Sequence, residues 1–195
     1  MGRRESAWVL GALLWGAGLG VGPASAAVSE PDRLWVVGAQ AFEDALYDLA
    51  YRELGRFAQV APTDQRRGDA IFLRGKAALA LGRYDEALGA FRTAETHPLR
   101  IATDGESSFW QAEALFRLRR FDEARARYSF FVRGYPTSPY ADDALYARGF
   151  SELELGRPDD AIVSFTTLLR ERPQSALASS AAYAAARELV RAKRW

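Results

Sequence analysis

The sequence of 195 residues contains no cysteine and only one histidine, His97. Without cysteine the chain can form no disulfide, no thiolate nucleophile, no cysteine-ligated zinc site and no lipid anchor on an N-terminal cysteine. A single histidine supplies too few ligands for a multi-histidine metal site and argues strongly against a histidine-based catalytic triad. The cysteine-dependent classes, including lipid-anchored proteins, are therefore excluded from the start.

An excess of charge of one sign is also missing. The chain has 26 Lys and Arg against 25 Asp and Glu, which gives a formal net charge of +1. Domains that bind nucleic acid normally carry a clear basic excess. The local run of arginines over residues 117–127 has acidic neighbours, which favours ordinary salt-bridged helix surfaces. We therefore expect no nucleic-acid partner.

Catalytic motifs are absent as well. The sequence has no H-E-x-x-H pair and no phosphate-binding loop, and the segment around Gly149 lacks the second glycine of a nucleophile elbow. His97 directly precedes a proline in a connector, where a surface loop residue is expected rather than a base or ligand. The sequence thus predicts no enzyme activity, no cofactor and no metal.

Residues 1–26 have the pattern of a secretory signal. Arg3 and Arg4 form a basic start, residues 7–21 are apolar, and Ala24-Ser25-Ala26 is a small-x-small cleavage site. The alternative is an uncleaved membrane anchor, but spanning a bilayer needs about 20 apolar residues and this run is shorter. We expect cleavage after Ala26, which leaves one domain over residues 27–195.

The rest of the chain repeats with a period of 37 residues. The segments 82–88, 119–125 and 156–162 are copies of one motif in which two acidic residues precede an alanine. Other columns recur at the same spacing. A small residue occurs at Gly38, Gly75, Ala112, Gly149 and Ala186, and a bulky one at Leu54, Phe91, Tyr128 and Phe165.

These columns predict two antiparallel helices in each unit. Apolar residues recur at three-and-four spacing over residues 73–81 and again over 87–94, with a break at Gly82-Arg83. The small column allows the two helices to approach closely, and the bulky column fills the adjacent space. The acidic pairs fall in the first turn of each second helix, where the helix dipole favours negative charge. Ser138 and Ser175 are predicted to cap the first helices of their units.

The two ends of the array depart from this pattern. Residues 40–46 contain no glycine turn, so the first helix of the first unit is predicted to be short or fused to the second. The last unit has a first helix, at about 176–193, and Trp195 then stands where a second helix would begin. We count about four and a half units and expect either a longer repeat protein or a partner that covers the open end.

The common pattern of the units is, in this order, a small residue, a Gly-x-Tyr/Phe turn, an alanine, an aromatic residue and a proline. With this order of features, residues 31–195, approximately, resemble the tetratricopeptide repeat (TPR) family. The resemblance implies an all-α, right-handed solenoid of helix hairpins. The Tyr-Pro-x-Ser connector at 135–138, together with the signal pattern, resembles a bacterial envelope branch that contains an outer-membrane-assembly TPR lipoprotein and a Tol-Pal-associated cell-division coordinator. Since a lipid anchor is excluded, a periplasmic protein is the nearer analogue.

One further column is aromatic in every first helix. The resemblance implies that first helices line a concave groove for extended or helical peptide segments, and aromatic rings would supply burial for such a ligand. The competing interpretation places these rings in the core between repeats. A more varied row follows four residues later and is the row predicted to read the ligand. The predicted protein-binding residues are Phe72, Lys76, Phe109, Glu113, Tyr146, Phe150, Tyr183 and Arg187, with Trp35 heading the aromatic column.

Two functions remain open from the sequence. The first is a non-catalytic periplasmic scaffold or adaptor that binds protein or peptide segments, in association with envelope complexes for outer-membrane or cell-wall assembly. The second is the recruiting N-terminal module of a longer envelope enzyme or of a secretion or export component. The sequence names neither the partner nor the pathway.

Overall fold

The computed structural model describes residues 28–98 and 105–193. The predicted signal segment, residues 1–26, and Trp195 lie outside the described residues. Within these ranges the chain forms nine α-helices and no strand. The helices are α1 (Glu30–Glu43), α2 (Tyr47–Val60), α3 (Arg67–Ala80), α4 (Tyr84–Glu95), α5 (Glu106–Arg117), α6 (Phe121–Gly134), α7 (Ala141–Glu154), α8 (Pro158–Glu171) and α9 (Ala178–Arg191).

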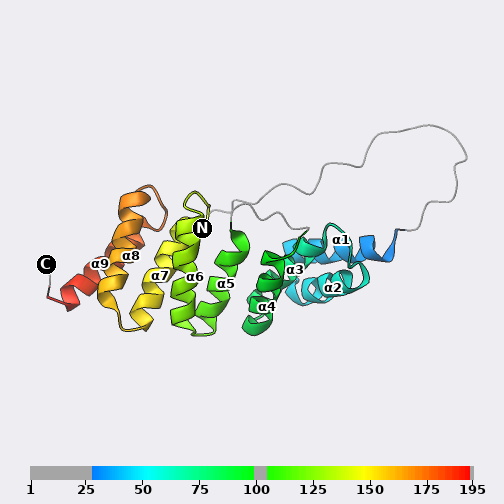
Figure 1. The fold of residues 1–195 in the computed structure, drawn as a ribbon, viewed down its shortest axis with the longest axis horizontal. Coiled ribbons are helices and arrows are strands. Elements are labelled where there is room, and N and C mark those ends of the chain that lie inside the picture. The colour runs from blue at the N-terminus through cyan, green and yellow to red at the C-terminus, as the bar shows by residue number, and fades with distance from the viewer. Residues whose placement is uncertain (1–27, 99–104, 194–195) are drawn as a thin grey trace, which may run out of the picture.

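The helices form an elongated array in chain order, with α1 and α9 at opposite ends (Figure 1). Each helix packs on its neighbours in the chain, and the first helices of the first three units also touch, since α3 contacts both α1 and α5. The all-α solenoid of helix hairpins predicted from the period is confirmed. No helix in the described ranges combines the length and apolar character needed to cross a membrane.

The turn inside each unit requires one residue with positive φ. Gly82 and Gly156 supply it at 75° and 69°, and Arg119 adopts 59° at the equivalent place. In the first unit Ala45 takes the same role at 58°, so α1 runs for 14 residues and ends in a tight turn before α2. The prediction of a short or fused first helix was therefore wrong. The turn was not predicted because it contains no glycine. Ala45 adopts the left-handed conformation there, at a conformational cost of about 1–2 kcal/mol.

The small column sets the distance between the two helices of a unit. A Cβ atom on Gly75 would lie 2.8 Å from the Phe91 ring, and one on Gly149 would lie 2.5 Å from the Phe165 ring. Both distances are shorter than carbon atoms tolerate. The aromatic rings thus rest directly on the glycine backbone, as the sequence pattern predicted.

The acidic pairs lie in the first turns of α4, α6 and α8, as predicted. The serine caps were wrong. Tyr140 and Leu177 occupy the N-cap positions of α7 and α9, and neither side chain makes a capping hydrogen bond. Ser138 and Ser175 each accept a hydrogen bond from the backbone N–H two residues later, at 3.4 and 3.2 Å. These serines stabilise the connector turn rather than the helix end.

Candidate protein-binding groove

A pocket of about 400 Å³ opens between the first helices of units one to three. Its walls come from the ends of α1 and α3, the starts of α2 and α4, and the exposed side of α5. Aromatic rings dominate the lining, and two cations stand among them. The lining residues are Phe42, Tyr47, Lys76, Leu79, Ala80, Tyr84, Trp110 and Arg117.

Lys76 is held in the pocket by the rings around it. Its Nζ lies 4.9 Å from the centroid of the Trp110 ring and 5.5 Å from that of Phe42. These are cation–π distances. The same Nζ is 3.9 Å from Oε1 of Glu106, which also accepts a hydrogen bond from the Trp110 indole N–H at 3.4 Å. The ammonium charge is therefore partly balanced and fixed in direction.

Arg117 stands exposed at the pocket rim at the end of α5. One turn earlier, Glu113 is half-buried and accepts a hydrogen bond from the Tyr128 hydroxyl at 2.5 Å. Burial raises the pKa of Glu113 above its ordinary value, an effect that the Tyr128 hydrogen bond and the charge of Arg117 partly oppose. Glu113 thus anchors α5 to α6 and is not a free ligand-reading group, whereas the Arg117 side chain is exposed.

Because the folded-state pKa of Glu113 is raised above its ordinary value, this residue makes the protein less stable as the pH rises through that folded-state pKa. The folded state binds the proton more tightly than the unfolded state does, so deprotonation favours unfolding. Glu113→Gln keeps an oxygen acceptor for Tyr128 and removes this contribution. We expect urea-unfolding curves at pH 5 and pH 8 to show a smaller loss of stability for the variant than for the wild type. Equal losses would contradict the assignment. The control is Glu123→Gln, at an exposed carboxyl whose pKa Arg120 lowers. This variant should lose as much stability between pH 5 and pH 8 as the wild type does.

Two of the five residues of the aromatic column, Phe72 and Phe109, lie in the core. Phe72 and Phe109 are each only 4% exposed. Phe72 packs on Phe91, and Phe109 packs on Phe131, with ring centroids 5.6 Å apart in both pairs. These two residues offer almost no surface to a ligand, so here the competing interpretation, burial between repeats, describes the structure.

Two of the rings are covered by the following unit, through a ring contact that spans 31 residues and a hydrogen bond that spans 34. The Tyr140 ring stacks on Phe109 with centroids 4.8 Å apart, and its hydroxyl donates to Glu106 at 3.0 Å. In the first unit Arg66 takes the place of Tyr140: its guanidinium lies 5.9 Å from the centroid of Trp35 and donates to Asp32 at 2.9 Å. A carboxylate near the start of one first helix thus fixes the residue that covers that helix's aromatic ring.

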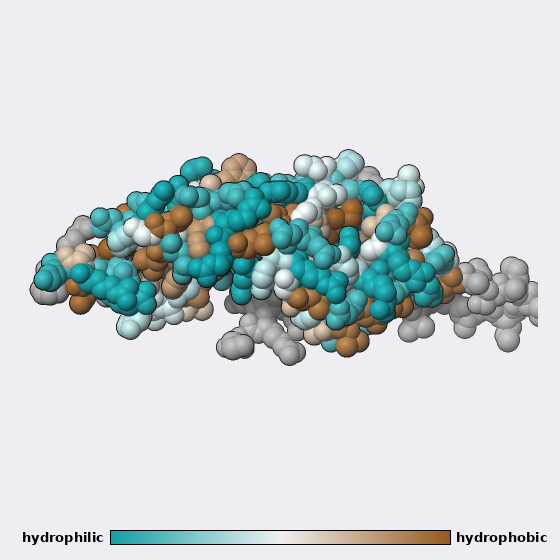
Figure 2. Space-filling view, turned by 90° about the horizontal axis from the view of Figure 1, so that it is seen from below, coloured by the Kyte–Doolittle hydropathy of each residue, from teal (hydrophilic) through white to brown (hydrophobic). Residues whose placement is uncertain are grey.

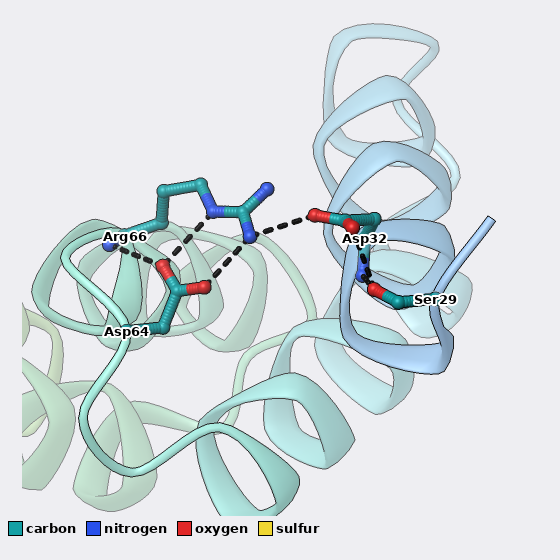
Figure 3. A network of polar contacts seen from close by, with 4 residues as sticks. All are labelled: Ser29, Asp32, Asp64 and Arg66. Carbon is teal, nitrogen blue, oxygen red and sulfur yellow. Dashed lines mark hydrogen bonds and ion pairs between the residues drawn. The ribbon is translucent and has the colours of Figure 1, made fainter. Parts of the chain in front are cut away.

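Figure 3 shows the contacts of Arg66 with Asp32 and Asp64, which form a clamp at the N-terminal end of the array. Arg66 donates from Nε and Nη2 to Asp64 at 2.9 and 2.7 Å, and from Nη2 to Asp32 on α1. Hydrogen bonds from Ser29 and Arg66 lower the pKa of Asp32, and those from Arg66 lower the pKa of Asp64. The clamp ties α1 to the connector between α2 and α3.

The remaining predicted residues lie toward the other end. Tyr146 and Phe150 are half-buried, and both contact the Phe165 ring, at 5.7 and 5.4 Å between centroids. Tyr183 is 71% exposed. Arg187 is bound by its neighbour Glu188, with 2.8 Å between Nε and Oε1. The structure therefore does not gather the eight predicted residues into one site, and only Lys76 lines the pocket.

The other residues of the pocket are not among those predicted from the sequence. Tyr47 and Tyr84 stand 37 residues apart at the aromatic position of the turn motif, and Phe42 and Leu79 share another column with the same period. That column of apolar residues one turn before each intra-unit break was the available signal. Trp110 stands in a second apolar column, with Val36, Leu73, Ala147 and Ala184, in which no other residue is aromatic. The described ranges contain no cluster of acidic or histidine side chains that could hold a metal ion.

The profile of the tetratricopeptide repeat family matches residues 72–139 and 109–176, and the chain belongs to this family. MamA from Desulfovibrio magneticus RS-1 superposes with a TM-score of 0.70 at 16% identity, over 86% of this chain and 89% of that one. A tetratricopeptide repeat protein from Parabacteroides merdae gives 0.69 at 16% identity, over 85% and 62%. At this identity the likeness shows the fold alone. No curated protein matches the sequence significantly.

Proposed function

We propose that the protein is a non-catalytic periplasmic scaffold or adaptor that holds a segment of another protein in the groove between its first helices, in outer-membrane or cell-wall assembly. Membership of the TPR family supports a role in protein–protein interaction. The signal pattern of residues 1–26 supports export. The single observation that carries the proposal is the aromatic pocket between α1, α3 and α5.

The pocket chemistry indicates what kind of segment fits. Rigid aromatic walls bury an apolar anchor side chain well, because few rotamers are lost on binding. Arg117 is exposed at the rim, and Lys76 presents a second positive charge within the pocket. A peptide with an apolar anchor next to a carboxylate therefore matches the site best, with the aromatic rings supplying burial and the cations fixing orientation.

The test is binding of peptides selected from a random phage-displayed library on the purified protein. The double variant Ala80→Glu with Arg117→Glu alters two exposed rim residues without touching the core. We expect it to weaken binding of the selected peptides at least tenfold in fluorescence anisotropy titrations, because it places two negative charges at an acidic ligand's site.

The matched control is Ala126→Glu with Arg133→Glu, which makes the same changes at exposed positions of α6. It should leave the affinity within about twofold, since neither residue lines the pocket. Equal weakening by the two double variants would show that net charge alone matters and would refute the pocket. Export is tested separately by fusing alkaline phosphatase after residue 193, which is active only outside the cytoplasm. An inactive fusion would refute the periplasmic location.

A further inference from the structure

One corner of the pocket has an equivalent one unit further along the array. In the pocket this corner lies beside the turn of unit two and consists of Leu79, Tyr84 and Arg117. The residues 37 positions later are Phe116, Phe121 and Glu154. The apolar character is thus kept, whereas the charge is inverted. Apolar groups are exposed in more than one unit, since apolar patches interrupt the hydrophilic surface along the array (Figure 2).

The equivalent residues Phe116, Phe121 and Glu154 form what we call the second subsite. The two rings meet edge to face with centroids 5.4 Å apart, as Phe42 and Tyr47 do at 5.8 Å in the wall of the pocket. Both rings of the second subsite are half-buried, and the Glu154 side chain is 49% exposed. The second subsite therefore repeats the aromatic wall of the pocket and adds an accessible carboxylate.

The second subsite holds a cation of the chain itself, Arg119. The guanidinium carbon of Arg119 lies 5.6 Å from the centroid of Phe121, and its Nη2 lies 3.8 Å from Oε2 of Glu154. These are distances of a cation–π contact and an ion pair. The same turn position holds a glycine in the neighbouring units, Gly82 and Gly156. The contacts of Arg119 show that the ring and the carboxylate together accept a guanidinium group.

Arg119 is held only weakly in this place. Its side chain is 79% exposed, and ion pairs at such exposed positions contribute little to stability. A cation from a ligand can therefore displace it at small cost. Glu113, one period after Lys76, is engaged by the Tyr128 hydroxyl, so we assign the contact with the ligand to Glu154.

We propose that the second subsite binds a lysine or arginine of the same partner segment that fills the pocket, and that this side chain displaces Arg119. The inference rests on the proposed function, because it extends the pocket along the groove. A segment that leaves the pocket at Arg117 and runs toward α7 reaches Phe121 and Glu154 next. Arg117 attracts a carboxylate of the segment, whereas Glu154 attracts a cation.

The spacing of the two subsites predicts the pattern in the partner segment. Equivalent points on neighbouring helices of this kind are on the order of 10 Å apart. An extended chain advances ~3.3 Å per residue. In an extended segment the basic residue therefore stands about three residues from the acidic one. The opposite charges of the two subsites also fix the direction in which the segment lies.

Peptides selected from the random phage-displayed library test the charge preference. Separate pools are selected on the wild type and on Glu154→Lys, and both pools are sequenced. We expect the wild-type pool to be enriched in lysine or arginine about three residues from the acidic position. The Glu154→Lys pool should keep the acidic position and lose the basic one. The control is Glu123→Lys on α6, another exposed carboxylate paired with an arginine, which should select the wild-type pattern.

Arg119→Gly tests the displacement. Units two and four have glycine at this turn position with a positive φ, so the variant keeps the turn. For a basic peptide from the wild-type pool we expect the affinity in fluorescence anisotropy titrations to rise about two- to fivefold, because the competing cation is gone. The same peptide with its basic residue replaced by glutamine should bind the wild type and Arg119→Gly equally.

Three results would overturn the inference. They are identical pools from the wild type and Glu154→Lys, an unchanged affinity of the basic peptide for Arg119→Gly, and dimers of the wild type that Glu154→Lys abolishes. The last result would assign the second subsite to another copy of the chain. If the selected peptides still lose affinity for the double variant Ala80→Glu with Arg117→Glu, the proposed function stands. Failure to select any peptide that this double variant weakens would refute the pocket itself.

Discussion

Phe109→Ala is expected to lower the free energy of unfolding by about 3–5 kcal/mol, the usual cost of removing a fully packed phenylalanine. Phe109 contacts Phe131, Tyr128 and the Tyr140 ring that covers it. Removing its ring opens a cavity at the junction of α5, α6 and the start of α7. Urea unfolding followed by far-UV circular dichroism measures the loss.

The matched variant is Tyr183→Ala, at the same position of the last first helix. Because Tyr183 is 71% exposed, the variant should change stability by less than about 0.5 kcal/mol. Similar losses in the two variants would mean that the column is buried alike at both sites, contrary to the contacts described above. If Phe109→Ala is as stable as the wild type, Phe109 is not a core residue and again becomes a candidate for ligand binding in the groove.

Gly149→Ala is expected to lower the unfolding free energy by about 1–3 kcal/mol, although alanine is the better helix former. The added methyl would lie 2.5 Å from the Phe165 ring, so the two helices of unit four must move apart. Gly89→Ala adds the same methyl in α4 where nothing lies within 4 Å. It should raise stability by about 0.5–1 kcal/mol. Thermal unfolding of both variants checks the opposite signs, and a stabilised Gly149→Ala would contradict the close approach.

The period of 37 predicted most of the fold because the recurring residues make their contacts within a single helix hairpin. The glycine column, the acidic first turns and the aromatic residues of the second helices all act within one hairpin, and each lies where the sequence placed it. The turn at Ala45 was not predicted because the sequence signal for a positive φ is glycine. Here the packing of α1 on α2 imposes a positive φ on alanine.

The candidate site was harder to predict because it depends on neighbouring units. Whether an aromatic ring in a first helix is buried depends on the residue 31 positions later, which is Tyr140 over Phe109 and Arg66 over Trp35. These two residues share neither size nor charge, so the sequence shows no column there. The pocket likewise combines helix ends from three units, and one hairpin pattern does not reveal it.

The most direct test of the proposed function is photo-crosslinking in the native cell envelope. A benzoylphenylalanine residue replaces Ala80 at the pocket rim in one strain and Ala126 on α6 in another, both at exposed positions. We predict a discrete crosslinked adduct with another protein from position 80, weakened by Arg117→Glu, and none from position 126. Adducts of equal yield from both positions, or from position 126 alone, would contradict a partner held between α1, α3 and α5.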